Sequence, residues 1–253
     1  ITVLGLADHD TTSGWAEATS AVHGDLQLVL GAEVSCLTPE GLSVHMLGLL
    51  FDQENQPLQQ LLADSRDTRI PRMKKMIENL QGAGYDITLE DVQAVTPEGA
   101  TVGRPHLADA LVAKKIVKSR DVAFVDLLNN DSPFYVSHAA PTPEDAIRAI
   151  RAAGGVAVIA HPFASRRGQI MTAESFHTLV TAGLNGIEAY HRDHSEDERE
   201  QLIAIAKTLD LVITGASDYH GTGKLNQLGE NTTSQAEWER LESMADQRRV
   251  VTR

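Results

Sequence analysis

The chain has 253 residues, of which 42% are hydrophobic and 23% charged, and its formal net charge is −13. This length and composition fit one barrel-sized globular domain, or a core domain with an insertion. The acidic balance excludes a general surface for duplex nucleic acid, whose phosphates need many compensating cations. A small phosphorylated substrate needs only a few local cations, so it remains compatible with the composition.

Three further features limit the cellular setting. Cys36 is the only cysteine, so the chain cannot form an intrachain disulfide. No apolar run approaches the roughly 20 residues that span a bilayer. The first residues lack the basic segment of a signal peptide. We therefore expect a cytoplasmic protein without a membrane partner.

The N-terminal part alternates strands with a helix. Apolar runs that end in polar residues predict buried strands, and the turn Thr38–Gly41 predicts a hairpin. A helix is expected over 14–22, with Gly24 as its stop. The expected strands cover residues 1–7, 26–33, 34–37 and 42–50.

The pattern becomes purely helical after Pro57. Apolar residues at helical spacing predict a long helix over 57–83, interrupted near Pro71. Shorter helices are expected over 88–94, 105–115 and 120–129. A helical block between two strand-rich parts indicates an insertion over 57–135, which divides a barrel into residues 1–56 and 136–253.

Strands and helices alternate again from Pro143. Units of strand, helix and strand at this spacing favour parallel strands with right-handed crossovers. The expected strands cover 156–160, 186–190 and 211–214, and the expected helices cover 143–153, 173–182, 195–209 and 237–247. The fold class is therefore α/β.

Histidines and carboxylates stand at the ends of these apolar runs. Taken singly, each has an ordinary explanation: a helix cap, a solvated strand end or a hydrogen-bonded core histidine. Together they come from the ends of five separate strands, and an α/β fold brings such strand ends to one shared site. Imidazole with carboxylate and without thiolate is a ligand set for Zn, Mn or Fe. The residues are His9, Glu33, His45, His161, Asp218 and His220.

A second candidate site lies in the helical insertion. Arg104 and His106 stand at the expected start of a helix, where backbone N–H groups and a guanidinium can bind a phosphate. A surface arginine at a helix start is the alternative. Beyond these, Arg166, Arg167 and Lys224 are expected to add positive charge at the rim, and His138, His191 and His194 lie in loops that can border the site.

The strand-end motifs resemble a known family in their order and spacing. They are similar to the successive motifs of the polymerase-and-histidinol-phosphatase (PHP) superfamily, in particular its stand-alone nucleotide phosphoesterase branch. The resemblance extends over almost the whole chain. The motifs are Leu6–Thr12, Gly31–Ser35, His45–Gly48, Ala160–Pro162 and Gly215–His220.

The resemblance implies a distorted (β/α)7 barrel with two or three divalent metal ions, Mn, Fe or Zn. All six strand-end residues named above would be metal ligands, with Glu33 bridging two ions. Arg104 and His106 would hold the substrate phosphate, with the helical insertion as a substrate cap. Tyr135 and Tyr190 would line the cavity.

The sequence departs from the family pattern in one respect. Family members open with a strand that ends in His-x-His, followed by an aspartate, and the chain contains no such motif. The barrel would lack its first strand and first helix and would leave two edges unpaired. We expect that a segment with this motif precedes Ile1 in the native protein.

The implied function is hydrolysis of a phosphomonoester of a small nucleotide, a nucleoside monophosphate or a 3',5'-bisphosphate. A metal-activated water would attack phosphorus, and no protein nucleophile would be needed. One alternative is 5'-to-3' removal of nucleotides from short RNA. Others are a non-catalytic metal-binding module and a metal-dependent amidohydrolase.

Overall fold

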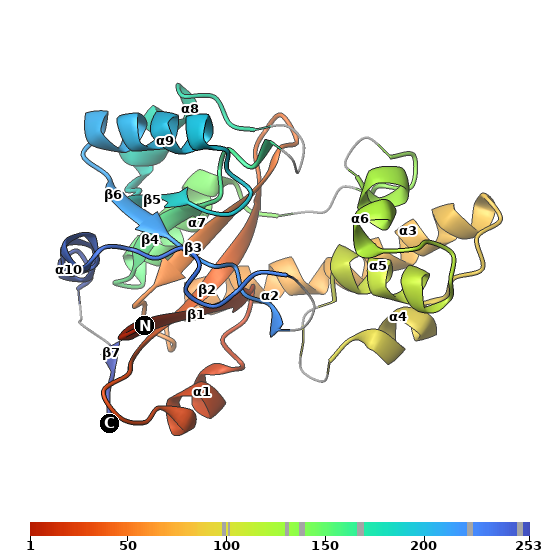
Figure 1. Ribbon diagram of the computed structural model, residues 1–253, viewed down its shortest axis with the longest axis horizontal. Coiled ribbons are helices and arrows are strands. Elements are labelled where there is room, and N and C mark those ends of the chain that lie inside the picture. The colour runs from red at the N-terminus through yellow and green to blue at the C-terminus, as the bar shows by residue number, and fades with distance from the viewer. Residues whose placement is uncertain are drawn as a thin grey trace. The chain divides into compact units, whose positions relative to one another are not determined.

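The protein, seen in a computed structural model, divides into two units (Figure 1). One unit combines Ile1–Leu62 with Pro141–Arg253, and the other is Ala63–Ala140. The structure describes residues 1–97, 100, 102–129, 132–136, 140–165, 170–221, 225–246 and 250–253. The second unit is helical, and an insertion over 57–135 that acts as a substrate cap stays a prediction.

The first unit is built on a curled mixed sheet. Its strands follow the order β1-β2-β3-β4-β5-β6, and β7 pairs with β2. β2 runs parallel to β1 and antiparallel to β3, whereas β4, β5 and β6 run parallel. The strands are β1 (Val3–His9), β2 (Gln27–Leu37), β3 (Ser43–Leu49), β4 (Val156–Ala160), β5 (Gly186–Tyr190), β6 (Val212–Gly215) and β7 (Val250–Val251). This arrangement confirms the predicted hairpin and the parallel units.

Two sequence-based expectations about this sheet are wrong in detail. The segments 26–33 and 34–37 form one continuous strand, β2, because each residue from Gly31 to Leu37 pairs with β3 without a break. The short strand β7 is not predicted by any apolar run, since two residues are too few to show a period.

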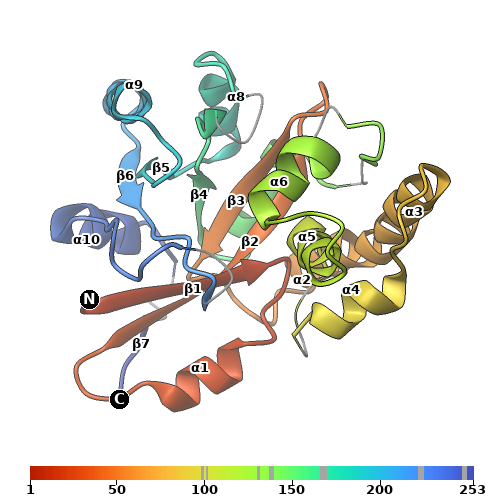
Figure 2. The ribbon, with the colours of Figure 1, turned by 45° about the vertical axis from the view of Figure 1, so that its right-hand side comes forward.

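Helices cover this sheet on both faces. They are α1 (Trp15–Ala21), α7 (Pro143–Ala152), α8 (Ser175–Ala182), α9 (Glu196–Thr208) and α10 (Gln235–Ser243). α7 packs on β3 and β4, α9 on β5, and α10 on β6. Figure 2 shows α1 beside the β1–β2 pair, where the Trp15 indole N–H donates to the Gly31 carbonyl oxygen at 2.9 Å.

The alternation of side chains along each strand separates two cores. In β4, Ala157 and Ile159 belong to the larger cluster, which includes residues of α7, α8 and α9. Val156 and Val158 point the other way and pack with Val29 and Val212. We call this second side of the sheet the valine face. Its continuation at the strand ends carries the candidate site.

The helical unit has its own core. Buried side chains that include Met76, Leu80, Leu107 and Leu111 pack together there. Its elements are α3 (Arg69–Gly82), α4 (Leu89–Val95), α5 (Arg104–Ala113), α6 (Arg120–Ala123) and the π-helical turn η1 (Phe124–Leu128), while α2 (Gln56–Asp67) crosses the boundary between the units.

The predicted interruption near Pro71 is present but lies earlier. α2 ends at Asp67 and α3 begins at Arg69, so Pro71 is the third residue of α3. The first-turn N–H groups of a helix have no intrahelical partner, so a proline there removes no helical hydrogen bond. The break therefore comes where α3 starts. No described helix is long and apolar enough to cross a membrane.

Candidate metal centre

Strand register brings three predicted ligands to one edge of the valine face. His9 ends β1 directly opposite Glu33 of β2. His45 lies opposite Ser35 of β2 and Ala160 of β4. Because β3 runs antiparallel to both neighbours, its beginning reaches the edge where β2 and β4 end. The positions of His9, Glu33 and His45 in their strands therefore give them the same face.

Glu33 is the centre of the resulting cluster. Its Oε1 lies 2.7 Å from His45 Nδ1 and 3.3 Å from His161 Nε2, and its Oε2 lies 3.7 Å from His9 Nε2. The two imidazole nitrogens of His45 and His161 are 3.4 Å apart. Three histidines that span more than 150 positions of the sequence thus converge on the carboxylate of Glu33.

The electrostatics of the cluster keep Glu33 ionised. Burial alone would raise the pKa of this carboxyl, since only 8% of the residue is exposed. The charges of His9 and His45, with hydrogen bonds from His161 and His45, outweigh burial and hold the pKa well below its usual value. The carboxylate is therefore available as an anionic ligand at neutral pH.

The donor set fits a divalent cation. His9, Glu33 and His45 each offer one ligand atom, and these atoms lie within 4.8 Å of one another. Two donors that share a tetrahedral zinc ion at about 2.1 Å stand about 3.4 Å apart, close to the separations found around Glu33. Nitrogen and oxygen donors without thiolate suit Zn, Mn or Fe.

Strained backbone marks three of the strand exits. Asp10, His161 and Asp218 have φ angles of +55°, +32° and +48°, in the left-handed region that non-glycine residues rarely adopt. Such conformations cost free energy and persist where surrounding contacts hold them, often at functional sites. At His161 the left-handed turn ends β4 and lets the backbone N–H donate to Glu188 Oε2 at 3.3 Å.

Asp218 and His220 form a second pair of predicted ligands. Asp218 Oδ1 lies 3.3 Å from His220 Nδ1, and that nitrogen lies 2.8 Å from the carbonyl oxygen of Asp218. Nδ1 therefore carries the proton and donates it to the carbonyl, which leaves the lone pair of Nε2 available for a metal. His191 connects the two groups: its Nε2 is 3.5 Å from Asp218 Oδ2, and its ring centroid is 5.2 Å from that of His161.

Sequence reasoning missed several polar residues at this edge. Glu188 is 2% exposed inside β5, where a single carboxylate in an apolar strand was the available signal. Asp10 is fully buried and accepts from the Ser35 N–H at 2.8 Å and the Ser35 hydroxyl at 3.0 Å, so it joins β1 to β2. His191 and His194, which the sequence places in loops that can border the site, are both buried, and His191 lies beside His161 and Asp218.

His194 has a structural role. Its Nδ1 donates to the Ala189 carbonyl at 2.9 Å, and its Nε2 accepts from the Phe163 N–H at 3.3 Å. Burial lowers the pKa of this imidazole, so the ring stays neutral and ties the end of β5 to the loop after His161.

The predicted phosphate ligands lie in the helical unit. Arg104 is the first residue of α5, and its Nη1 donates to the Leu128 carbonyl at 2.9 Å. His106 Nδ1 accepts from the Gly103 N–H at 3.1 Å, so in the neutral ring Nε2 carries the proton and faces away from this bond as a donor.

An arginine cluster surrounds Arg104 in the same unit. The guanidinium carbons of Arg72 and Arg104 lie 5.1 and 5.2 Å from the centroid of the Tyr135 ring. The pKa of Arg72 is lowered to about 10, mainly by burial. The charges of Arg104 and Arg69 lower it further, and Tyr135 raises it. Guanidinium groups stay protonated in proteins, so the charges of Arg104 and Arg69 act unfavourably on the charge of Arg72. Four further basic or histidine residues that the sequence places at the rim, Arg166, Arg167, Lys224 and His138, lie outside the described residues.

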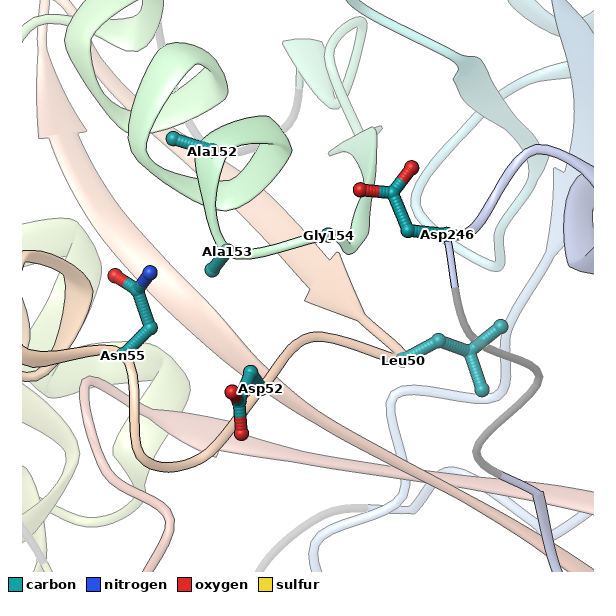
Figure 3. Close-up of a pocket in the computed structure, with 7 residues that line it drawn as sticks. All are labelled: Leu50, Asp52, Asn55, Ala152, Ala153, Gly154 and Asp246. Atoms are coloured by element: carbon teal, nitrogen blue, oxygen red, sulfur yellow. The ribbon is translucent and has the colours of Figure 1, made fainter.

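A hollow of about 200 Å³ lies elsewhere in the first unit (Figure 3). Leu50, Asp52, Asn55, Gly154 and Asp246 are among its lining residues. Leu49 pairs with Val156 at the beginning of β4, whereas His45 pairs with Ala160 at its end. The hollow therefore lies at the sheet edge opposite the Glu33 cluster and takes no part in the site.

Several known proteins are similar to this chain over most of its length. No protein-family model matches the sequence. The 3',5'-nucleoside bisphosphate phosphatase of Chromobacterium violaceum is 32% identical over 223 residues, which cover 88% of this chain and 78% of that protein. The 5'-3' exoribonuclease of Haemophilus influenzae is 30% identical over 236 residues, which cover 91% and 84%.

The fold is also similar to that of a protein of known structure. A crystal structure from Bifidobacterium adolescentis, of a protein described as a candidate metal-dependent phosphoesterase, has 38% sequence identity and a TM-score of 0.90. The match covers 98% of this chain and 87% of that one. The chain belongs to this family of metal-dependent phosphoesterases. It is an enzyme that hydrolyses phosphoric esters, and its Glu33 cluster is a candidate site for the metal.

Proposed function

We propose that this protein is a PHP-superfamily enzyme that hydrolyses a phosphomonoester of a small nucleotide, a nucleoside monophosphate or a 3',5'-bisphosphate. Its curled sheet would be part of the distorted (β/α)7 barrel of that superfamily. The bisphosphate phosphatase among its relatives supports this substrate class. The observation that carries the proposal is the convergence of three imidazoles on the ionised carboxylate of Glu33.

Six residues are proposed to hold two or three divalent ions, Mn, Fe or Zn. When bound, such ions act as Lewis acids and lower the pKa of a coordinated water toward neutrality. Glu33 has two carboxylate oxygens that face different imidazoles, His45 and His161 on one side and His9 on the other. This arrangement suits a bridging ligand. Asp218 and His220 would complete the ligand set with one carboxylate oxygen and the Nε2 lone pair.

The arginine cluster is proposed to bind a phosphate group of the substrate. A phosphate would offset the repulsion among Arg69, Arg72 and Arg104, and guanidinium groups bind phosphate through two parallel hydrogen bonds. The Nε2–H of His106 would supply a further donor. The Tyr135 ring lies within cation–π distance of both Arg72 and Arg104 and would help to position their guanidiniums.

A second candidate function is 5'-to-3' hydrolysis of short RNA. The exoribonuclease of Haemophilus influenzae favours it, because the same hydrolytic chemistry can act on a phosphodiester. The net charge of −13 would limit such a substrate to short strands. The enzymatic relatives favour both of these hypotheses over a non-catalytic module.

Three substrates separate these functions: a nucleoside monophosphate, a 3',5'-bisphosphate and a 5'-phosphorylated oligoribonucleotide, each with added Mn²⁺. We expect phosphate release from the nucleotides and its loss in the His161→Ala variant. Glu40→Gln, in an exposed turn, is the matched control and should behave as the wild type. Stepwise shortening of the oligoribonucleotide without phosphate release from the nucleotides would favour the exoribonuclease. Equal activity of the wild type and His161→Ala would contradict the proposed site.

A further inference from the structure

His191 is a fully buried histidine at the candidate metal centre that no predicted role accounts for. It is the first residue after β5 and has no exposed surface. Its carbonyl oxygen accepts from Arg199 Nη2 at 2.8 Å and from the His194 N–H at 3.2 Å. The backbone of this loop is therefore held in place, and the Asp193 N–H, which donates to Nδ1, holds the ring.

Hydrogen bonding determines which ring nitrogen carries the proton. The Asp193 N–H donates to His191 Nδ1 at 3.0 Å, so Nδ1 is an acceptor and the neutral ring is protonated at Nε2. A nitrogen that carries a proton has no lone pair for a metal. His191 is thus unsuited to be a ligand, although its ring lies beside that of His161.

The Nε2 atom lies near a carboxylate without making a hydrogen bond to it. Nε2 is buried and has no hydrogen-bond partner, and Asp218 Oδ2 lies 3.5 Å away. A buried N–H group left without a full hydrogen bond costs free energy. The other oxygen of the same carboxylate, Oδ1, faces His220. The two oxygens of Asp218 therefore have different neighbours.

We propose that His191 is a positioning residue that holds Asp218 Oδ2 through its Nε2–H, so that Oδ1 is directed to the metal. This inference rests on the proposed role of Asp218 as a ligand. Residues that orient metal ligands in this way typically change metal affinity 10- to 100-fold when they are removed. The left-handed backbone of Asp218 makes such support important, because its strained conformation depends on surrounding contacts.

His194 provides the internal contrast. It lies three residues further along the same loop and is also buried, but both of its ring nitrogens have backbone partners. Its contacts are complete without any ligand. Of these two histidines, His191 is the one whose ring has a buried nitrogen near a carboxylate of the candidate site.

The test measures Mn²⁺ affinity of the metal-stripped full chain by calorimetry, without any substrate. We expect His191→Phe, which keeps the ring volume but removes the donor, to weaken Mn²⁺ binding about 10- to 100-fold. His191→Gln, whose amide can donate from a similar place, should restore most of the affinity. In a double-mutant cycle, His191→Phe should cause little further loss once Asp218→Asn is present, because both act through the same carboxylate.

The outcomes separate this inference from the proposed function. If Asp218→Asn weakens Mn²⁺ binding and His191→Phe does not, the positioning role is wrong and the ligand assignment stands. If Asp218→Asn binds Mn²⁺ as the wild type does, the ligand assignment itself fails. Imidazole ¹⁵N spectra of the wild type should show the proton of His191 on Nε2, and a proton on Nδ1 would overturn the inference whether or not the variants fold.

Discussion

The two units of the protein gather opposite charges. In the first unit, Glu33 and Asp218 stand among imidazoles, a set that attracts cations. In the helical unit, Arg72 and Arg104 flank one tyrosine ring, with the charge of Arg69 nearby, a set that attracts anions. The arginine cluster brings like charges together, which raises the free energy of the folded state, whereas the imidazoles of the first unit stabilise the carboxylate of Glu33.

The two clusters would contribute to phosphoester hydrolysis in different ways. A phosphoryl group that reacts with water needs cations around its oxygens, and they can be metal ions or guanidiniums. The first unit offers ligands for metal ions, and the second offers guanidiniums directly. The comparison therefore predicts that damage to the first cluster removes metal binding and chemistry, whereas damage to the second weakens substrate binding.

Replacement of the central carboxylate tests the first half of this comparison. Glu33→Gln should lower kcat/KM roughly 10³-fold or more, because metal ions supply several kcal/mol of stabilisation and each 1.4 kcal/mol is a factor of ten. Phosphate release and metal content of the purified variant would be measured together. Glu40→Gln, on the exposed turn between β2 and β3, is the control. A variant at Glu33 with normal metal content would contradict the assignment.

The buried contact between β1 and β2 should affect stability more than chemistry. Asp10→Ala removes two hydrogen bonds to Ser35 and places alanine at a φ of +55°. The free energy of unfolding in urea, measured with EDTA present, should fall by about 3 kcal/mol. The exposed Asp25→Ala is the control. A loss below about 1 kcal/mol would show that other contacts hold this strand exit.

Loss of a guanidinium tests the second half of the comparison. Arg104→Gln should raise KM for phosphorylated substrates about 10- to 100-fold, as expected when a charged hydrogen bond worth 1.5–3 kcal/mol is lost, with a smaller change in kcat. Arg120→Gln is the matched control in the same unit, because the Arg120 guanidinium is held by the carboxylate of Asp109. Equal KM values for both variants would remove the support for the phosphate site.

The smallest expected effect concerns His194, whose imidazole has a structural role. It is a change in stability with pH. Burial lowers the pKa of His194 below the usual value of about 6.5. Below about pH 6.5 this imidazole is protonated in the unfolded chain. In the folded protein it binds the proton only at a lower pH, because its pKa is lowered. Stability should therefore fall as the pH drops from about 6.5 toward the lowered pKa, and it should be constant above.

Unfolding midpoints between about pH 5 and 8, with EDTA present, would test this expectation. His194→Asn should have a flatter profile than the wild type below about pH 6.5. The exposed His177→Gln variant should keep the wild-type profile. An unchanged slope in His194→Asn would show that His194 is not the residue responsible.

Much of the fold follows from the sequence because its signals are local. The runs 156–160 and 186–190 are found as β4 and β5 with the same limits, since flanking glycine and polar residues interrupt them clearly. The observed helix limits differ from the predicted ones by a few residues, because capping hydrogen bonds determine where a helix begins and ends. Ser234, for example, accepts from the Glu237 N–H, and α10 therefore starts before the predicted residue 237.

The site was partly predictable for a different reason. Polar residues at the ends of apolar strands are easy to recognise in a sequence. Four of them lie close together in the structure: His9, Glu33, His45 and His161. Glu188 and His191 could not be assigned, because their contacts with His161 and Asp218 depend on the order of parallel strands in space. No local pattern encodes that order.

The central claim is that Glu33 and its imidazoles bind a divalent ion. The most direct measurement is a crystal soaked in Mn²⁺, with an anomalous difference map recorded on the manganese signal. The account predicts a peak about 2.0–2.3 Å from a Glu33 carboxylate oxygen and from imidazole nitrogens of this cluster. A manganese peak elsewhere, with Glu33 still hydrogen-bonded to His45 and His161, would contradict it.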